Sequence, residues 1–314
     1  MSFPKPFRGI IPPMITPLNH DFSLDEKSLD LIIEHMIAGG VHGIFILGTT
    51  GEFASLSSKV KKQLIELTCK IVNHRIPVLV GITDCSFQES LDLAECAKEA
   101  EADILVATTP FYMNVGQDEL AYYFSRLADD VDLPLYLYNM PSHTGITIDL
   151  ETVKILADHP NIIGIKDSSG DQKYFESLCD SFREYAEFTV LVGPEEILLE
   201  TMNMGGHGGV TGGANLFPAL YVKLFEALEY QDKERIKVLN DTVQFLSKNL
   251  YSHGTYQSNY LKGLKASMSF EGLCQGILAL PLRAFDEKEK EALKGKYEAV
   301  KEAVEKVLSR KIES

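Results

Sequence analysis

Eight short apolar segments recur along roughly the first 230 residues, and each is followed by a stretch with helical periodicity. The segments are hydrophobic almost throughout rather than alternating, which is typical of parallel strands covered on both faces. Eight strand–helix units in succession predict an α/β fold, a (β/α)8 TIM barrel, and an open doubly wound sheet is the structural alternative. The expected strands are residues 9–15, 43–47, 78–81, 104–107, 135–138, 162–166, 189–192 and 208–211.

Helix start signals support this alternation of strands and helices. Ser23-Leu24-Asp25-Glu26 and Ser86-Phe87-Gln88-Glu89 both fit the capping box, in which a serine and a later glutamate satisfy the first amides of a helix. After about Tyr230 the strand pattern stops, and residues 231–249, 256–267 and 286–309 have the pattern of three helices. The sequence therefore predicts a barrel domain over residues 1–229 and a C-terminal three-helix domain over residues 230–314.

The composition is that of an ordinary globular protein and argues against several classes. Of 314 residues, 45% are hydrophobic, and no apolar run is long enough for a transmembrane helix. The N-terminus has no apolar core of the kind that a secretory signal needs. Five cysteines without a CxxC pair argue against disulfides and a zinc site, and suit a reducing cytoplasm. A formal charge of −15 argues against nucleic acid or an anionic membrane as a partner.

Two residues at the ends of neighbouring expected strands are candidates for catalysis, since the active site of such a barrel lies at the C-terminal ends of its strands. Lys166 ends the sixth strand, where burial disfavours the ammonium and leaves the neutral amine that Schiff-base chemistry needs. A lysine that reaches solvent or pairs with Asp167 is the alternative. Tyr138 ends the fifth strand, where a phenol can transfer protons, and packing on Pro141 is its alternative.

Two glycine-rich segments could bind an anion through backbone amides. Gly48-Thr49-Thr50-Gly51-Glu52 follows the second strand and combines two hydroxyls with free amides, but it lacks the Gly-Lys-Ser/Thr of a P-loop. A tight turn capped by threonine is the alternative. Residues 205–213 are also rich in glycine, which more often serves close packing of a strand and a helix. The histidines, His207 included, form no ligand cluster, so we expect no metal site.

Four segments together resemble the dihydrodipicolinate synthase / N-acetylneuraminate lyase family, the class I pyruvate-dependent aldolases. They are GTTGE at residues 48–52, YNMP at 138–141, IGIKD at 163–167, and Gly193 with GGHGGV at 205–210. The proline-rich segment at residues 12–17 is also similar to the family. The resemblance covers most of the barrel and extends to the C-terminal helices. It implies a (β/α)8 barrel with a helical C-terminal domain, assembled as a homotetramer, a dimer of dimers.

The resemblance also implies a set of catalytic residues. Lys166 would form a Schiff base with a 2-oxo acid such as pyruvate, and Tyr138 would transfer protons. Thr49 resembles the hydroxyl that relays protons, and Tyr112 stands at the position whose side chain is lent to the neighbouring subunit. The enamine that forms on Lys166 would add to an aldehyde, or in reverse the aldehyde would leave. This chemistry needs no metal and no organic cofactor.

The resemblance to the family also implies that five further residues bind substrate: Thr50, Gly48, Gly193, Val210 and His143. Thr50 and Gly48 belong to the turn that would hold the pyruvate carboxylate, and Gly193 and Val210 would line the pyruvate pocket. His143 stands where members that make the lysine precursor carry an arginine for the carboxylate of aspartate semialdehyde. Because a mostly neutral histidine replaces a fixed bidentate donor, we expect an enzyme that cleaves a 2-oxo-3-deoxy or 4-hydroxy-2-oxo acid.

Several alternatives remain at the level of the sequence. The first is 4-hydroxy-tetrahydrodipicolinate synthase, which joins pyruvate to aspartate semialdehyde. The second is a dehydratase or deaminase that uses the same imine without breaking a carbon–carbon bond. A noncatalytic binder of 2-oxo acids is the third alternative. The presence of Lys166, Tyr138 and Thr49 argues against it, because binding alone does not require an imine. A metal-dependent barrel enzyme would require clustered ligands, which the eight scattered histidines do not provide.

Overall fold

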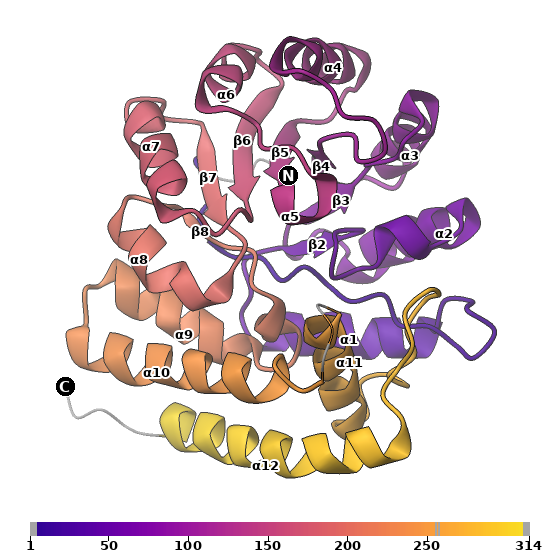
Figure 1. The fold of residues 1–314 in the computed structure, drawn as a ribbon, viewed down its shortest axis with the longest axis vertical. Coiled ribbons are helices and arrows are strands. Elements are labelled where there is room, and N and C mark those ends of the chain that lie inside the picture. The colour runs from indigo at the N-terminus through magenta and orange to yellow at the C-terminus, as the bar shows by residue number, and fades with distance from the viewer. Residues whose placement is uncertain (1–4, 255, 257, 310–314) are drawn as a thin grey trace.

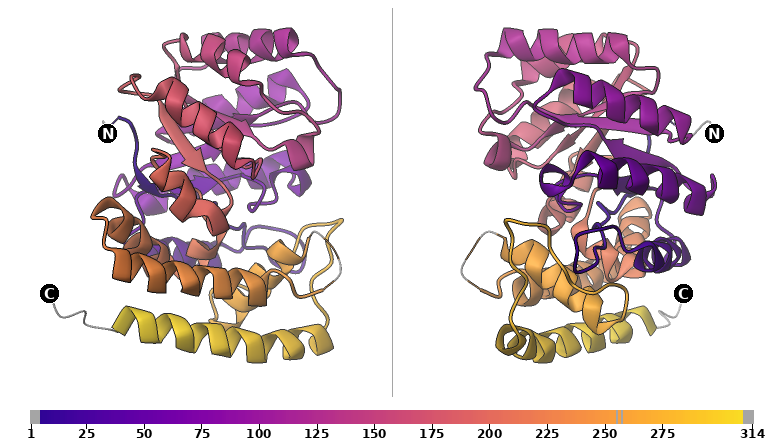
Figure 2. Two further views of the ribbon diagram at one scale, coloured as in Figure 1. Left: turned by 60° about the vertical axis from the view of Figure 1, so that its left-hand side comes forward. Right: turned by 90° about the vertical axis from the view of Figure 1, so that its right-hand side faces the viewer.

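The computed structural model describes residues 5–254, 256 and 258–309, and in it eight parallel strands form one curled sheet surrounded by helices (Figures 1 and 2). The strands follow the order β1-β8-β7-β6-β5-β4-β3-β2. The chain after β1 closes the remaining gap, because Phe45 N donates to Pro12 O at 3.0 Å and Met14 N donates to Phe45 O at 2.8 Å. The fold is therefore a (β/α)8 barrel, and this prediction is confirmed.

The elements alternate as the sequence pattern requires. The strands are β1(Gly9–Ile10), β2(Ile44–Ile46), β3(Val78–Gly81), β4(Ile104–Thr108), β5(Leu135–Asn139), β6(Ile162–Asp167), β7(Thr189–Val192) and β8(Gly208–Gly209). The helices are α1(Glu26–Ala38), α2(Ser58–Val72), α3(Phe87–Glu99), α4(Gln117–Asp130), α5(Pro141–Thr144), α6(Leu150–Ala157), α7(Gln172–Phe182), α8(Leu198–Asn203), α9(Pro218–Glu229), α10(Lys233–Leu250), α11(Asn259–Phe270) and α12(Glu287–Ser309). Three short 3-10 helices, η1(Phe53–Ser55), η2(Glu195–Ile197) and η3(Gly212–Asn215), follow strand ends.

Several expected bounds were wrong. The first strand ends at Ile10 rather than at residue 15, because Pro12 and Pro13 have no N–H to donate to a ladder. Helix α1 is capped by Asp25, whose side chain accepts from Ser28 N, and not by Ser23. Ser86 does cap α3, as expected. The second C-terminal helix begins at Asn259 rather than at residue 256, and residue 257 of the expected range lies outside the described residues.

The strand register places two side chains at the same level inside the barrel. Tyr138 of β5 pairs with Lys166 of β6, and Leu191 of β7 lies beside Lys166. Two residues earlier, Tyr136 pairs with Gly164, where an added Cβ would lie 2.9 Å from the Tyr136 ring and 2.6 Å from a backbone oxygen. A glycine at this level therefore makes room for the tyrosine ring in the barrel interior, below the level of Lys166.

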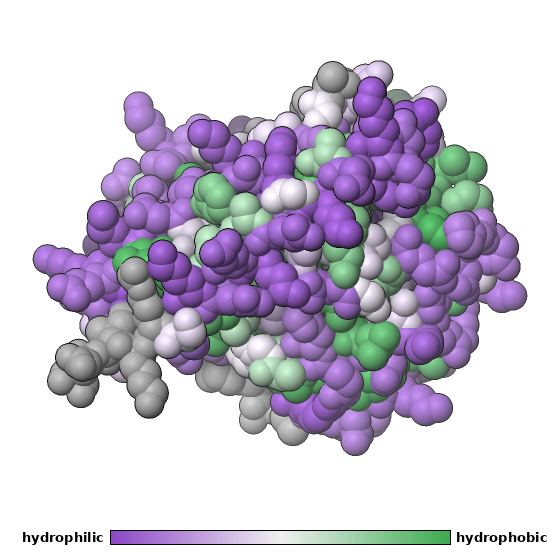
Figure 3. All heavy atoms as spheres, turned by 90° about the horizontal axis from the view of Figure 1, so that it is seen from below, coloured by the Kyte–Doolittle hydropathy of each residue, from purple (hydrophilic) through white to green (hydrophobic). Residues whose placement is uncertain are grey.

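The three helices after β8 and α9 pack together along one side of the barrel (Figures 1 and 2). Helix α10 lies between α9 and α12, and α12 buries a stripe with helical spacing, formed by Leu293, Tyr297, Val300 and Val304. Hydrophilic side chains cover most of the face on this side of the molecule (Figure 3). We propose a domain boundary near residue 230. No helix of the described residues is long and apolar enough to cross a membrane.

Candidate active site

A cavity of about 660 Å³ opens at the C-terminal ends of the strands. Its lining combines strand ends and the turn after β2 with residues of α11 and residues 281–282. Seven of the nine site residues expected from the sequence line this cavity: Thr49, Thr50, Tyr138, His143, Lys166, Gly193 and Val210. The other two, Gly48 and Tyr112, are not among its lining residues.

Lys166 lies at the inner end of this cavity and is 5% exposed. Its Nζ atom lies 3.9 Å from the centroid of the Tyr138 ring and 5.2 Å from that of Phe45. The alternative of an ion pair with Asp167 was wrong, because that carboxylate accepts from Asn139 Nδ2 at 2.7 Å and from Ser169 Oγ at 2.8 Å. Within the described part of the chain, the Nζ atom of Lys166 has no hydrogen bond and no ion pair, whereas its backbone pairs with β5 and β7. Its amine is thus left for a ligand.

The hydroxyl of Tyr138 lies 3.1 Å from Thr49 Oγ1, and either atom can donate. Tyr138 is 3% exposed, and its ring meets the Phe45 ring edge-on at 6.4 Å. Packing therefore fixes the ring while the hydroxyl keeps a polar partner that can give or accept a proton. A phenol beside an amine and linked to a second hydroxyl can carry protons to and from a group bound on the amine.

The turn at residues 48–52 presents hydroxyls and amides to the same cavity. Glu52 N donates to Thr49 O at 3.0 Å and closes the turn, and Thr50 Oγ1 lies 3.2 Å from Tyr260 Oη. Among the described residues, the backbone amides of Thr49 and Thr50 donate no hydrogen bond. Two free amides beside a hydroxyl can hold a carboxylate without a formal positive charge.

The pocket wall beside Lys166 is formed by Gly193 and Val210. Their amides are used in the sheet, since Gly193 N donates to Asp167 O at 2.7 Å and Val210 N donates to Val192 O at 2.8 Å. An added Cβ at Gly193 would lie 1.9 Å from Ser168 Oγ. Glycine is therefore required at residue 193 for Ser168 to keep its position at the cavity wall.

His143 and Tyr112 lie further from the amine. His143 is exposed in α5 at the cavity rim, with Nδ1 3.0 Å from Ser142 Oγ, and desolvation lowers the pKa of its imidazole. Tyr112 is 84% exposed in the loop between β4 and α4. Its neighbour Phe111 lines the cavity and contacts the ring of Phe53 at 6.0 Å. The single chain thus does not bring Tyr112 to Lys166.

Two further groups in the cavity wall were missed by sequence reasoning. Glu195 accepts from Gly213 N at 2.7 Å, from Tyr251 Oη at 2.9 Å and from Tyr221 Oη. Burial raises the pKa of Glu195 to about 7, and these donors oppose the rise. Because Glu195 lies just after β7, its position at a strand end could have identified it. Tyr260 comes from α11, which a rule based on strand ends does not reach.

The charges around the cavity are unevenly distributed. Among the described residues, Lys166 is the only lysine or arginine in the lining, whereas three glutamates belong to it, Glu52, Glu195 and Glu196. The Glu52 carboxylate is paired with Lys265, which lies outside the lining. The lining also contains residues with hydroxyl groups, including Thr49, Thr50 and Ser168. No group of three or more possible metal ligands is found in the described residues. Away from Lys166 the cavity is therefore suited to a neutral hydroxylated group rather than to a second carboxylate.

Comparison with known proteins assigns a family. The model of the "Dihydrodipicolinate synthetase family" matches residues 6–300. The solved dihydrodipicolinate synthase of Bacteroides thetaiotaomicron is 43% identical with a TM-score of 0.92, over 95% of this chain and 100% of that one. YagE of Escherichia coli K12, solved in complex with pyruvate, is 31% identical with a TM-score of 0.89, over 94% and 99%. A relative of Escherichia coli K12 named "Probable 2-dehydro-3-deoxy-D-pentonate aldolase YjhH" is 34% identical over 88% of this chain and 91% of its own length.

Proposed function

Because this chain belongs to the dihydrodipicolinate synthetase family, we propose that it is a class I lyase that reversibly joins pyruvate, held on Lys166, to an aldehyde. One observation carries the proposal. The buried Lys166 Nζ lies 3.9 Å from the centre of the Tyr138 ring, and the hydroxyl of that tyrosine lies 3.1 Å from Thr49 Oγ1. The cavity thus contains a nucleophilic amine and a proton carrier with its own partner, which are the groups that imine chemistry requires.

The proposed reaction begins when the Lys166 amine attacks the keto carbon of the substrate. Water leaves the carbinolamine, and the protonated imine then accepts electrons when C3 loses a proton or when the C3–C4 bond breaks. Tyr138 moves these protons, and Thr49 relays them. The free amides of the turn and the Thr50 hydroxyl hold the substrate carboxylate, and Gly193 and Val210 form the pocket for the pyruvyl group. Gly48 lies outside the lining and would act only through the backbone of this turn. The steps require no metal and no organic cofactor.

For the second substrate we propose a neutral, hydroxylated aldehyde, released from a 2-oxo-3-deoxy or 4-hydroxy-2-oxo acid. Lys166 is the only cation among the described lining residues, and it is used by the imine. His143 lies at the rim, where its lowered pKa favours the uncharged form at neutral pH. Among the described lining residues, a second carboxylate would therefore meet no further fixed positive charge. The relative YjhH is named as a probable aldolase for a 2-dehydro-3-deoxy acid, which is a substrate of the proposed kind.

The alternative is 4-hydroxy-tetrahydrodipicolinate synthase activity, with aspartate semialdehyde as the acceptor. The relative from Bacteroides thetaiotaomicron, which is 43% identical, supports it. A dehydratase or deaminase that uses the same imine is a further possibility within the same chemistry. Both share the Lys166 step with the lyase and differ from it in what happens after the imine forms.

The test is reduction with borohydride in the presence of pyruvate, followed by mass mapping of the modified peptide. We expect a pyruvate-derived adduct on Lys166, and none in Lys166→Ala. Lys173→Ala, at an exposed lysine of the next helix, is the matched control and should be trapped like the wild type. No adduct under conditions that trap a known Schiff-base lyase would refute the proposed mechanism. Assays with 2-oxo-3-deoxy acids, and with pyruvate plus aspartate semialdehyde, then separate the lyase from the synthase.

We also propose that the protein is a cytoplasmic homotetramer, a dimer of dimers, in which Tyr112 reaches the site of a neighbouring subunit. Two apolar side chains beside each other are strongly exposed in the single chain, Tyr112 at 84% and Met113 at 67%. Exposed apolar groups that lie together are typical of a contact between chains. The formal net charge of −15 argues against an anionic membrane or nucleic acid as a partner.

A further inference from the structure

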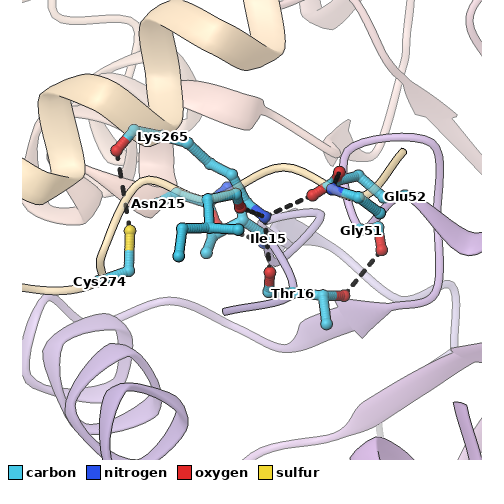
Figure 4. Close-up of polar contacts among 9 residues, drawn as sticks. Ile15, Thr16, Gly51, Glu52, Asn215, Lys265 and Cys274 are labelled. Atoms are coloured by element: carbon cyan, nitrogen blue, oxygen red, sulfur yellow. Dashed lines mark hydrogen bonds and ion pairs between the residues drawn. The ribbon is translucent and has the colours of Figure 1, made fainter. Parts of the chain in front are cut away.

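A buried ion pair joins the C-terminal helices to the turn at residues 48–52. The side chains of Lys265, in α11, and Glu52 are each 1% exposed, and Lys265 Nζ donates to Glu52 Oε1 (Figure 4). The same ammonium donates to the carbonyl oxygens of Thr16 and Ile277, each at 2.7 Å. Glu52 Oε2 accepts from Ala279 N at 2.7 Å. The three protons of the ammonium and both carboxylate oxygens therefore all have partners.

Stability alone is a poor explanation for this pair. Removing two charges from water costs several kcal/mol for each ion, and apolar residues of similar volume are often equally stabilising. The position of Glu52 gives a second reason to look beyond stability. It ends the turn that carries Thr49 and Thr50, and its φ of 59° is a left-handed conformation that a residue other than glycine keeps only when its surroundings hold it.

Two further hydrogen bonds hold the turn at residues 48–52, one with Thr16 and one with Tyr260. Thr16 Oγ1 donates to Gly51 O at 2.7 Å, so Thr16 links Lys265 to the turn through its carbonyl and its hydroxyl (Figure 4). Tyr260, in the same helix as Lys265, places its hydroxyl 3.2 Å from Thr50 Oγ1. Helix α11 therefore contacts the turn at both Thr50 and Glu52.

We propose that Glu52 and Lys265 are positioning residues that act through this turn on the proton transfers of the active site. The pair sets the backbone of Thr49, whose hydroxyl lies 3.1 Å from Tyr138 Oη, and directs the free amides toward the substrate carboxylate. This inference rests on the proposed function. When the pair is removed, Lys166 still forms the imine, because none of its contacts changes, but Thr49 and Tyr138 no longer meet in a fixed geometry.

The test compares the wild type with the double variant Glu52→Gln/Lys265→Met, which leaves no buried charge unpaired. The number of competent sites is counted in one sample by borohydride trapping with pyruvate, and kcat of an untreated sample is divided by that number. Unfolded protein therefore does not lower the measured kcat. We expect kcat per trapped site to fall about tenfold or more, with a shifted pH profile and a raised KM for the 2-oxo acid. Lys301→Met is the matched control, since it removes an exposed ion pair of the same helical region and should leave all three quantities unchanged.

The possible outcomes separate the two proposals. A wild type that pyruvate cannot trap would refute the proposed function and this inference with it. A trapped double variant with the kcat and pH profile of the wild type would overturn the positioning role alone. If the double variant does not fold, Tyr260→Phe decides, because it removes only the hydroxyl that reaches Thr50. A severalfold loss of kcat per trapped site supports the role of α11, and unchanged kinetics overturn it.

Discussion

The proposed chemistry depends on three side chains from three different strand ends. Lys166 is followed directly by Asp167, yet their side chains face different partners, because alternate residues of a strand point to opposite sides of the sheet. Tyr138 shares the register level of Lys166 and therefore faces the same cavity. The amine is thus kept apart from the nearest carboxylate in sequence, while the phenol is kept beside it.

At this scale we predict that Tyr138→Phe lowers kcat by about 10²-fold or more, the range in which a positioned proton carrier acts. Thr49→Val should have a smaller effect, about tenfold, because it removes one hydrogen bond from Tyr138 and leaves the phenol in place. Steady-state kinetics with the cleaved 2-oxo acid measure both. Tyr185→Phe, at an exposed tyrosine, should match the wild type. If Tyr138→Phe also matched it, a different group would move the protons.

A second prediction concerns the choice of aldehyde. His143→Arg introduces a fixed cation at the rim of a cavity whose described lining residues otherwise contain only Lys166 as a cation. Acceptors that bear a distal carboxylate should therefore gain in kcat/KM relative to neutral hydroxylated ones, by about tenfold, the effect of one charge-assisted hydrogen bond. Competition between the two acceptor types measures the ratio. An unchanged ratio would indicate that His143 does not face the acceptor.

Among the elements, β7 and β8 are joined through a histidine side chain. His207 Nδ1 accepts from Val190 N at 2.9 Å, and His207 N donates to Val190 O at 2.9 Å. An accepting ring nitrogen must be unprotonated, and desolvation accordingly lowers the pKa of His207 to about 4. His207, which directly precedes β8, thus has a structural role in joining β8 to β7.

This geometry predicts how acid affects the fold. An unfolded histidine has a pKa of about 6.5, so between pH 6.5 and 4 the unfolded state binds more protons than the folded state. The contribution of His207 is fully present above pH 6.5 and is lost as the pH falls toward 4. The melting temperature of His207→Asn should therefore fall less steeply over this interval than that of the wild type. His20→Asn, at an exposed histidine with no ion pair among the described residues, should keep the wild-type slope.

Elements differed in how well the sequence predicted them. Seven of the eight strands were located within two residues at each end, because continuous apolar runs are typical of strands covered on both faces, whereas the first strand was predicted five residues too long. The cap of α1 was misplaced, since Ser23 and Asp25 both fit an N-cap and only the folded turn shows that Ser23 donates to Asp21 instead. The ion pair between Lys265 of α11 and Glu52 of the turn could not be predicted from the sequence pattern, because the two residues are 213 positions apart.

For the whole molecule the formal net charge is −15, and among the described residues the lining of the cavity contributes one lysine and three glutamates. The site proposed from sequence was largely located by the rule that strand ends carry function, and seven of its nine residues line one cavity. The rule about strand ends could not predict that Tyr251 and Tyr260 line the cavity, because their positions depend on how the C-terminal helices pack on the barrel. Nor could one chain show where Tyr112 acts, because its partner would be another copy.

The last prediction tests whether Tyr112 serves a neighbouring subunit. Tyr112 is 84% exposed and does not line the cavity of its own chain, so Tyr112→Ala should fold normally. If it completes a partner's site, Tyr112→Ala and Lys166→Ala are each nearly inactive alone but can complement each other in mixed assemblies. When equal amounts pair at random, about half of the pairs are mixed. Each mixed pair has one site of two with both an intact Lys166 and the partner's intact tyrosine, so about a quarter of wild-type activity should be recovered. In the control, two differently tagged copies of Lys166→Ala are co-expressed. They should assemble with each other but recover no activity, because no site has an intact Lys166. Absence of recovery in verified mixed assemblies would mean that Tyr112 acts within its own chain or not at all, because only a side chain that crosses between subunits can repair a defect at Lys166 of the other type.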